Sequence, residues 1–591
     1  MNSPRRAARV RAPELVGRGG WLGTGGRQLS LLDLRGSFVL LDFWTGCCVN
    51  CLHVLDELRP LEERFAGVLT VVGVHSPKFA HEAVHASVVA AVARHEVHHP
   101  VLDDPDLTTW KQYAVRAWPT LVLIDPEGYV VHVASGEGHV EGIARLLEEL
   151  VTEHDAKGTL RRSDRPHVPA PAAASALSFP GKAVRLPDGT LLVSDTAHHS
   201  LVVLDGDEVV RRIGTGARGR DDGDAPSFSE PQGLCLLEDG TVLVADSANH
   251  LLRAVDLRTG AVTTVAGTGQ VWRPGHLTSG PALRVALSTP WDFAEWDGEV
   301  VVAMAGTHQL WAFDGVSVRV LAGTTGEGLR DGEATAAYLA QPSGLAAGTD
   351  RLWFADAETS ALRWYRDGEV GTAVGTGLFD FGHRDGPAAD ALLQHPLGVT
   401  ALPDGSVAVC DTYNGAVRRY DPGTDTVTTL VTGLAEPSDA VVDGAHLLVV
   451  ESAAHRVTRL LLPSDALVVD GVAQRTQRPR TDLASGAVTL TVVFVPPPGQ
   501  KLDESFGPAT RLVVSASPAD LLAEGSGTGA ELTRSLVLQG NEGVLHVAAS
   551  AASCDVDAEH AACHVTQQDW GIPVRLVDGA AEHLQLVLNG L

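Results

Sequence analysis

The chain has 591 residues, which is too long for one hydrophobic core and corresponds to about three to five domains. Its 44% hydrophobic and 20% charged residues are ordinary for a folded protein, so the composition excludes a mostly disordered chain. With 73 acidic and 45 basic residues the net charge is −28, which argues against nucleic acid and anionic membrane surfaces as partners.

The N-terminal residues and the cysteine count indicate the cellular compartment of the protein. Residues 1–17 are basic, like the start of a signal peptide, but no apolar segment follows them. No apolar stretch of about 18 residues occurs anywhere, so we expect no membrane helix. Seven cysteines are few for a secreted disulfide scaffold of this length. These features together predict a soluble, cytoplasmic protein.

Residues 1–155 alternate strand-like and helix-like segments. FVLLDFW at 38–44 is typical of a strand buried on both faces, and the helical spacing at 51–66 predicts a helix kinked at Pro60. Further elements are predicted as a strand at 68–75, a helix at 79–95, a strand and turn at 120–128, a strand at 129–136 and a helix at 138–154. This order predicts an α/β layer domain, and the Ala-, Pro- and Arg-rich residues 156–178 predict a linker.

From 179 to 465 the chain repeats itself. Each unit opens with a proline-led turn, at Pro180, Pro231, Pro290, Pro342, Pro396 and Pro437. An apolar strand then ends in an acid in five units, at Asp195, Asp246, Asp356, Asp411 and Glu451, whereas the third unit has Met304. Units of three or four short strands cannot bury a face alone, so six of them predict a six-bladed β-propeller.

Several propeller residues have both a functional and a structural interpretation. We predict that the blade acids cap turns, although a ring of acids could bind a cationic partner. Asp222, Asp331 and Asp385 each precede a glycine and predict turns, because no calcium loop of the D-x-D-x-D-G type is present. The string GTGARG at 214–219 has dinucleotide-motif spacing, but it recurs between strands without a βαβ unit and indicates a repeat loop.

The last region, residues 485–591, alternates apolar and polar residues in several short runs. This pattern predicts a small all-β domain of the sandwich type. Cys554 and Cys563 flank a hairpin-like segment in it and could pair across that segment. The alternative is that they are two unpaired thiols in a reducing cytosol.

The chemistry that the sequence points to lies at Cys48-Val49-Asn50-Cys51, between a buried strand and a helix. Unsatisfied N–H groups and the helix dipole at a helix start stabilise a thiolate, so Cys48 is the predicted nucleophile. Cys51, one turn on, is placed to resolve a mixed disulfide. The alternatives are a structural zinc half-site or two core cysteines. Zinc needs about four ligands, and no second ligand pair appears in this domain, so we predict neither a metal nor a cofactor.

The stretch LLDFWTGCCVNC at 40–51 resembles the active-site segment of thioredoxin and TlpA-like proteins. The resemblance places Asp42 on the buried acid that takes a proton from the resolving cysteine, and Trp118-Pro119 on the cis-proline loop that faces the cysteine pair. A strand-end carboxylate satisfied by hydrogen bonds is the alternative for Asp42. Trp44, Trp118 and Cys47 are candidate auxiliary residues. Cys47 stands where relatives have Trp, and Val and Asn separate the cysteines, which departs from thioredoxin.

The order of the three regions carries a second resemblance. A thioredoxin-like domain with a C-C-x-N-C site, an NHL-type propeller and a β domain is similar to the NHL repeat-containing protein 2 family. The repeat signature is clearest at 245–250 and 410–414. The last region resembles the N-terminal domain of the DsbD reductant conduit, which implies that Cys554 and Cys563 exchange disulfides and receive electrons from Cys48 and Cys51.

The sequence therefore predicts a multidomain thiol–disulfide oxidoreductase. Its propeller would select a protein client, with Cys48, Cys51, Asp42 and Pro119 at the reactive site. The competing hypothesis is a scaffold or interaction protein whose C-x-x-C site is a redox sensor or a relic. A lyase or hydrolase activity of the propeller is less well supported, because no unit carries a distinctive set of catalytic residues.

Overall fold

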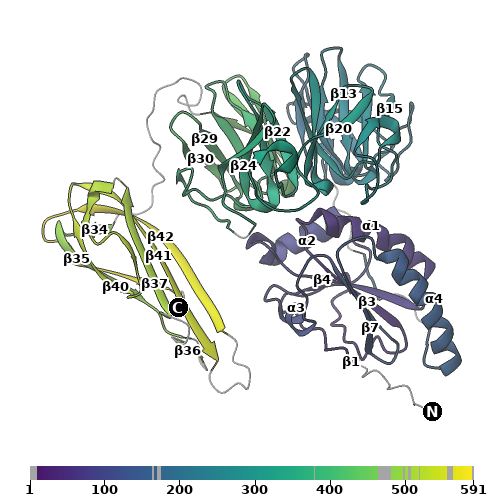
Figure 1. Cartoon of the computed structure of the whole chain (residues 1–591), viewed down its shortest axis with the longest axis horizontal. Coiled ribbons are helices and arrows are strands. Elements are labelled where there is room, and N and C mark those ends of the chain that lie inside the picture. The colour runs from purple at the N-terminus through teal and green to yellow at the C-terminus, as the bar shows by residue number, and fades with distance from the viewer. Residues whose placement is uncertain are drawn as a thin grey trace. The chain divides into compact units, whose positions relative to one another are not determined.

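The structure is a computed structural model. It describes residues 10–162, 166–169, 175–378, 380–462, 481–496, 500–502, 508–517, 519–555 and 563–588. The chain divides into two compact units, Met1–Asp470 and Gly471–Leu591 (Figure 1). The first unit contains an α/β domain and a ring of β-sheets, and the second contains β-sheets. The domain boundaries predicted at 155, 178, 465 and 485 stay predictions.

The α/β domain is thioredoxin-like and is built on one seven-stranded sheet of order β1-β7-β6-β3-β4-β5-β2. Central strand β3 pairs in parallel with β4 and antiparallel with β6. The strands are β1 (Val10–Arg11), β2 (Gly20–Leu22), β3 (Phe38–Trp44), β4 (Leu69–His75), β5 (Val101–Asp103), β6 (Thr120–Ile124) and β7 (Tyr129–Ser135). The helices are α1 (Val49–Arg64), α2 (His85–Arg94), α3 (Thr108–Gln112) and α4 (Val140–Lys157).

Alternating residues of β3 build a core on each face of this sheet. Phe38 and Leu40 pack with apolar residues of α1 and α4 on one face, and Leu41 and Phe43 pack with residues of β4 and β6 on the other. All seven residues of β3 are therefore buried, as the run predicts, in which Asp42 is the one polar residue. Helix α1 continues through Pro60, and the predicted helix at 79–95 is a short 3₁₀ turn followed by α2.

Six antiparallel sheets form the propeller in the part of the chain that the structure describes. Their main strands, blade by blade, are β8 (Ala183–Arg185), β9 (Leu191–Asp195), β10 (Ser200–Asp205) and β11 (Glu208–Ile213); β12 (Pro231–Leu236), β13 (Thr241–Asp246), β14 (Leu251–Asp256) and β15 (Val262–Ala266); β17 (Pro290–Trp296), β18 (Glu299–Met304), β19 (Gln309–Phe313) and β20 (Ser317–Ala322); β22 (Pro342–Ala347), β23 (Leu352–Asp356), β24 (Ala361–Arg366) and β25 (Glu369–Val374); β27 (Gly398–Ala401), β28 (Val407–Asp411), β29 (Ala416–Asp421) and β30 (Thr426–Thr432); and β31 (Pro437–Asp443), β32 (His446–Glu451) and β33 (Arg456–Leu461). Short edge strands extend the third, fourth and fifth blades, and they are β16 (Ser279–Pro281), β21 (Gly332–Glu333) and β26 (Gly386–Pro387).

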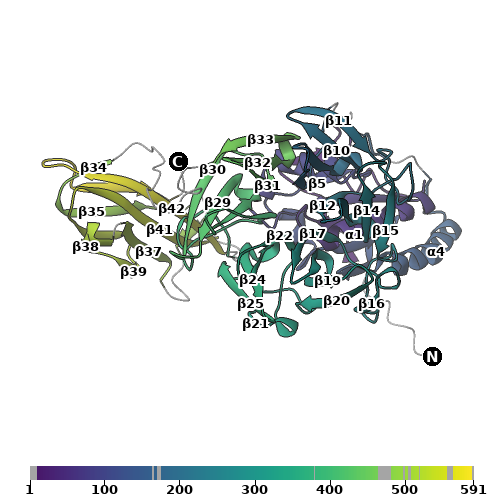
Figure 2. The same cartoon turned by 90° about the horizontal axis from the view of Figure 1, so that it is seen from above.

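The blades close into a ring, which Figure 2 shows from above. Each innermost strand contacts the innermost strand of the next blade, and β31 of the last blade contacts β8 of the first. The apolar clusters lie between neighbouring blades, and one of them joins Val193 and Val202 of the first blade to Val450 of the last. A single blade would leave both faces exposed, so this packing between neighbours makes the ring the stable unit.

A buried ion cluster lies where the innermost strands meet. The Nζ atom of Lys182 is 3.1 Å from Asp292 and 3.6 Å from Asp439, and it also donates to the Leu397 carbonyl at 2.8 Å. The other three blades have glycine at this position, two residues after the blade proline. A Cβ atom on Gly233 would lie 2.6 Å from backbone of the next blade, so that strand cannot carry a side chain there.

The blade acids are structural, and they do not form an open ring for a cationic partner. All five are fully buried. Three of them form ion pairs with fully buried arginines seven residues on, which are Asp246–Arg253, Asp356–Arg363 and Asp411–Arg418 at 2.7, 2.8 and 2.7 Å. Each arginine also contacts a second acid, which is Asp222, Asp331 or Asp385. The interpretation of these second acids as simple turn residues is therefore incomplete, because they complete the pairing of a buried arginine.

The second unit contains two β-sheets. One has the order β34-β42-β41-β37-β39, with β36 on β41, and the other has the order β38-β40-β35-β43. Residues of both sheets, such as Leu490 and Leu545, share one apolar core, as in a sandwich. The strands are β34 (Thr481–Leu483), β35 (Gly486–Val493), β36 (Gln500–Leu502), β37 (Thr510–Ser517), β38 (Leu522–Glu524), β39 (Gly527–Gly529), β40 (Thr533–Leu538), β41 (Glu542–Asp555), β42 (Cys563–Leu576) and β43 (His583–Val587).

Candidate functional site: the cysteine turn and the propeller face

The cysteine turn joins the buried strand β3 to helix α1. Cys48 is the N-cap residue of α1, with an extended backbone at φ −85° and ψ 109°. Its carbonyl accepts the first helical bonds, from the N–H of Cys51 at 2.9 Å and of Leu52 at 3.2 Å. The side chain of Cys48 therefore lies where a helix start presents unsatisfied N–H groups, which favour a negative charge.

The three cysteines of the turn differ in exposure. Cys48 is half-buried, whereas Cys47 and Cys51 are 4% and 0% exposed. Burial raises the pKa of the Cys51 thiol well above its usual value, and the nearby Cys48 and Asp42 add to the effect. Cys48 is therefore the most accessible thiol of the turn, and the buried Cys51 thiol favours its protonated form.

Asp42 lies on β3 and is fully buried. Neither carboxylate oxygen has a hydrogen-bond partner among the described residues, which rules out a strand-end carboxylate satisfied by hydrogen bonds. Burial raises the pKa of Asp42 to about 8. A carboxyl group with this pKa exchanges a proton near neutral pH, which is what a base or acid for Cys51 requires.

Replacement of Asp42 by asparagine is expected to flatten the pH dependence of stability. An unfolded aspartate has a pKa of about 3.9, so ionisation of buried Asp42 destabilises the fold progressively as pH rises from about 4 to above 8, by about 5–6 kcal/mol in total. Urea unfolding of the wild type and of Asp42→Asn at pH 5 and pH 8.5 measures this. The wild type should lose more stability than the variant between the two values, and equal losses would contradict the assignment.

The aromatic residues predicted around the site lie where the sequence places them. The peptide bond between Trp118 and Pro119 is cis, and the Trp118 indole donates to the Ser76 carbonyl at 2.8 Å. Trp44 is fully buried and packs edge-on against His75, with ring centroids 5.2 Å apart. Trp44 belongs to the apolar cluster that contains Cys51, and Cys48 and Trp118 pack against that cluster. An apolar cluster therefore surrounds the buried Cys51.

The second cysteine pair lies in the other unit. The backbone register of β41 and β42 places Cys554 directly opposite Cys563. Their side chains lie outside the described residues, so pairing between them and electron exchange with Cys48 and Cys51 stay predictions.

One feature that the sequence analysis missed is the role of the residue before each blade proline. All six of these residues have positive φ, between 43° and 62°. This backbone conformation is costly for any residue other than glycine, yet it recurs in every blade. Each of them contacts the thioredoxin-like domain: Phe179 with Arg94, Glu230 with His95, Thr289 with His53, Gln341 with Val49, His395 with Phe79, and Glu436 with His81 and Arg94. These six residues are called the pre-proline ring below.

Gln341 of the pre-proline ring holds the cysteine turn directly. Its Oε1 accepts from the Val49 N–H at 3.0 Å, and its Nε2 donates to the Cys47 carbonyl at 2.9 Å. The Cys47 N–H in turn donates to Glu82 at 3.0 Å. The propeller therefore fixes the backbone on both sides of Cys48.

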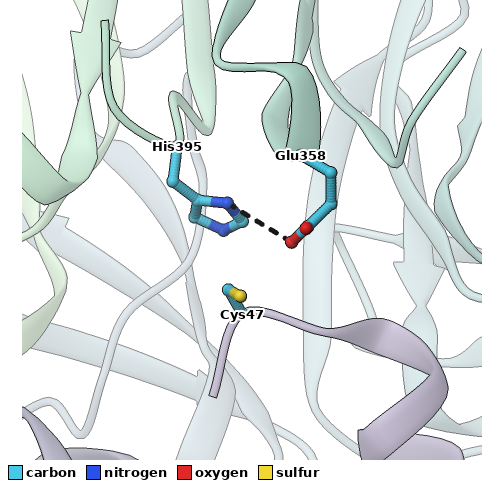
Figure 3. A group of neighbouring side chains, drawn as sticks. All are labelled: Cys47, Glu358 and His395. Atoms are coloured by element: carbon cyan, nitrogen blue, oxygen red, sulfur yellow. Dashed lines mark ion pairs between the residues drawn. The ribbon is translucent and has the colours of Figure 1, made fainter. Parts of the chain in front are cut away.

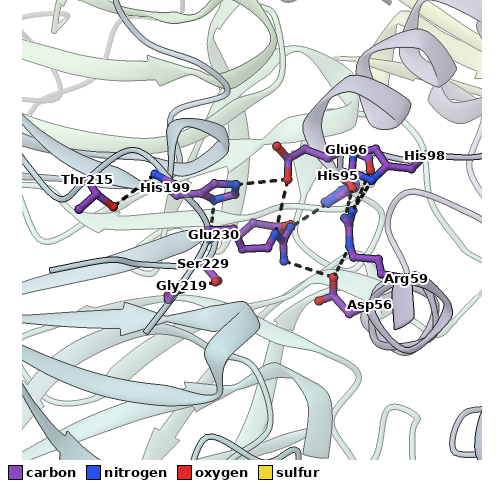
Figure 4. Close-up of polar contacts among 12 residues, drawn as sticks. Asp56, Arg59, His95, Glu96, His98, His199, Thr215, Gly219, Ser229 and Glu230 are labelled. Atoms are coloured by element: carbon purple, nitrogen blue, oxygen red, sulfur yellow. Dashed lines mark hydrogen bonds and ion pairs between the residues drawn. The ribbon is translucent and has the colours of Figure 1, made fainter. Parts of the chain in front are cut away.

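A charged network joins α1 and the end of α2 to the first two blades (Figure 4). Arg218 contacts Asp56, Glu96 and Glu230 at 3.2, 3.4 and 2.5 Å. Burial opposes the charge of Glu230, but a hydrogen bond with His95 and the Arg218 guanidinium outweigh it, so the pKa of Glu230 lies far below its usual value. A displacement of one domain would separate these charges and leave a buried charge without its partner. The network therefore favours one orientation of the two domains.

Comparison with known proteins was made on the whole chain. A family model described as thioredoxin-like matches residues 36–130, and a model of the NHL repeat matches 228–254 and 393–420. Protein SUPPRESSOR OF QUENCHING 1, chloroplastic, of Arabidopsis thaliana is 36% identical over 466 residues, which are 74% of this chain and 44% of that protein. NHL repeat-containing protein 2 of Gallus gallus is 34% identical over 475 residues, 73% of this chain and 64% of that protein.

A third relative matches only the N-terminal region. Thiol-disulfide oxidoreductase ResA of Geobacillus thermodenitrificans is 29% identical over 128 residues, which are 21% of this chain and 70% of that protein. The chain spans less than two thirds of the length of the first two relatives. Among the described residues, no helix is long and apolar enough to cross a membrane.

Proposed function

Because the chain is homologous to NHL repeat-containing protein 2 and belongs to that family, we propose that it is a thiol–disulfide oxidoreductase whose propeller shapes the redox site. The observation that carries the proposal is the position of Cys48, a half-buried N-cap thiol with buried Cys51 one turn further on. A relative that bears the name thiol-disulfide oxidoreductase over this region adds support.

The proposed reaction has two steps. The Cys48 thiolate attacks one sulfur of a client disulfide, which forms a mixed disulfide and releases the other client sulfur to take up a proton. The Asp42 carboxylate then takes the proton of Cys51, whose thiolate attacks the Cys48 sulfur. This attack releases the second client sulfur, which takes up a proton, so two electrons have passed from the cysteine pair to the client. The pair remains as a disulfide that an external dithiol must reduce. Pro119 shapes the side of the site where the client lies.

The pre-proline ring limits how the propeller takes part. All six of its residues contact the thioredoxin-like domain, so this face of the propeller is already occupied. We propose that a protein client is selected by the rest of the propeller and by the surface around Cys48 and Trp118. We also propose that the protein works in the reducing cytoplasm, which the few cysteines favour, although one relative is named chloroplastic.

A scaffold with a redox-sensing or relic site is the second candidate. The observation that favours it is the double hydrogen bond of Gln341 to the cysteine turn, which ties the redox site to a propeller side chain. In that case the C-x-x-C pair would respond to oxidation and would not turn over clients.

Trapping with Cys51→Ser tests the proposal. Without its resolving thiol, this variant should hold clients as mixed disulfides on Cys48, which appear as thiol-sensitive bands on non-reducing gels. Cys48→Ser/Cys51→Ser is the matched control and should hold none. Equal trapping by both variants, or by neither, would contradict the oxidoreductase proposal.

A further inference from the structure

The side chain of Cys47 is not used in the proposed reaction, and it lies in a cluster of its own. Cys47, Glu358 and His395 meet where the thioredoxin-like domain contacts the propeller (Figure 3). One donor atom of each, a sulfur, a carboxylate oxygen and a ring nitrogen, lie within 4.8 Å of one another. All three side chains are at most 4% exposed. They come from the cysteine turn, from the 3₁₀ turn after β23 and from the pre-proline ring.

Two polar atoms of this cluster face each other at ion-pair distance but have no hydrogen bond among the described residues. Glu358 Oε1 and His395 Nδ1 are buried, 3.7 Å apart, and have no hydrogen bond within the described part of the chain. A buried polar atom without a partner costs about 1–3 kcal/mol, so two facing ones need an explanation. Figure 3 shows the Glu358 carboxylate and the His395 ring facing each other, with the Cys47 side chain beside them.

The three side chains are held in place by their surroundings. The backbone of Cys47 is fixed by Glu82 and Gln341, as described above. The His395 ring is stacked on Tyr413 at 4.6 Å and packs against Phe79 at 5.3 Å. Such outer contacts orient metal ligands before an ion arrives.

The second carboxylate oxygen of Glu358, Oε2, already has a cationic partner. This oxygen pairs with the Lys78 ammonium, which also lies 3.9 Å from Glu327. The Oε1 atom is therefore free to serve a second partner while Lys78 keeps both of its acids.

A second group of possible metal ligands differs, because its atoms already have hydrogen-bond partners within the protein. Asp125, Glu127 and His154 also lie within 4.8 Å of one another. There, however, Asp125 accepts two backbone N–H bonds at 2.9 Å, and His154 Nδ1 is hydrogen-bonded to Thr159 at 2.7 Å. Local turn and helix-end bonds account for that group, and it carries no inference.

We propose that Cys47, Glu358 and His395, with a water molecule in the fourth position, bind a zinc-class divalent cation that bridges the thioredoxin-like domain and the propeller. Thiolate, imidazole and carboxylate are zinc ligands, whereas a sulfur ligand disfavours magnesium and calcium. Ligand atoms around tetrahedral zinc lie about 3.3–3.8 Å apart, so the 3.7 Å spacing of Glu358 and His395 fits and the sulfur closes up by on the order of 1 Å.

Binding has a simple balance of charge and protons. The Cys47 thiol loses its proton to solvent as the sulfur–metal bond forms, and no electron is transferred. The Cys47 thiolate and the Glu358 and Glu327 carboxylates together balance the charges of the ion and of Lys78. Metal binding also removes Cys47 as a vicinal thiol for Cys48, so Cys51 is left as the resolving residue. The site therefore adds to the proposed function and does not depend on it.

Zinc titration of the full reduced chain against a chromogenic chelator tests the site. We expect one tight site, with an affinity that Cys47→Ser, Glu358→Gln and His395→Ala each lower by at least about 100-fold. With Co²⁺, the sulfur-to-metal charge-transfer band should vanish in Cys47→Ser. Cys410→Ser, which removes a buried thiol of the fifth blade, is the matched control and should bind like the wild type.

The rival site is the cysteine pair itself. Cys48→Ser/Cys51→Ser should keep the tight site if the proposal is right. Loss of binding in that variant with retention in Cys47→Ser would overturn it, and so would equal binding in all variants. Thermal unfolding without zinc shows whether each variant is folded, and zinc should raise the unfolding temperature of the wild type but not of Cys47→Ser.

Discussion

Replacing Cys48 by serine is expected to lower the rate of insulin-disulfide reduction by at least about 10³-fold, to the uncatalysed background. Serine has the shape of cysteine but is not ionised at neutral pH, so the N-cap position of α1 no longer holds a nucleophile. The fold should be unaffected, because Cys48 is half-buried and its side chain caps no helical N–H. Dithiol-coupled turnover with a purified full-length chain measures the effect.

Two controls make this result specific. Cys410→Ser removes a fully buried thiol on β28, far along the chain, and should leave turnover within about twofold of the wild type. Cys51→Ser should allow the first step but block release of the client. If the wild type and Cys48→Ser reduce insulin at the same slow rate, the enzyme proposal fails and the scaffold interpretation replaces it.

The elements that the sequence predicts best are those with a strong local pattern. The strand at 38–44 is correct to the residue, because a strand buried on both faces is a nearly continuous apolar run, here interrupted only by Asp42. The blade prolines are equally informative, since β12, β17, β22 and β31 each begin at one of them. A proline lacks an N–H and has a fixed φ, so it suits the first residue of a strand.

The parts that the sequence does not reveal depend on contacts between distant segments. Short helix α3 and strands β2 and β5 have too few residues for a periodic pattern. The pre-proline ring was overlooked because its residues share a position and not a chemical type. The cluster of Cys47, Glu358 and His395 comes from three separate elements, so no ligand spacing along the chain could indicate it.

The buried ion pairs of the propeller lead to the second large prediction. In the fourth blade, Arg363 is fully buried between Asp356 and Asp331, at 2.8 Å from each. In the third blade the same two positions hold Met304 and Trp311, which are 1% and 0% exposed and pack in one apolar cluster. The third blade thus replaces an ion pair with an apolar pair of large side chains, and both solutions keep the blade closed.

Replacing the ion pair of the fourth blade by the Met–Trp pair of the third blade is therefore expected to change stability non-additively. Arg363→Trp leaves Asp356 buried without its cation, and Asp356→Met leaves Arg363 with only one acid, so each should destabilise the fourth blade by about 3–5 kcal/mol. The double variant removes both charges of the pair. Its loss of stability should be at least about 2 kcal/mol smaller than the sum of the losses of the two single variants. Hydrogen exchange of the β23 and β24 amides, read by mass spectrometry, measures the local stability. Strictly additive losses would mean that the two residues act independently, and the third blade would then owe its closure to contacts other than the Met304–Trp311 replacement.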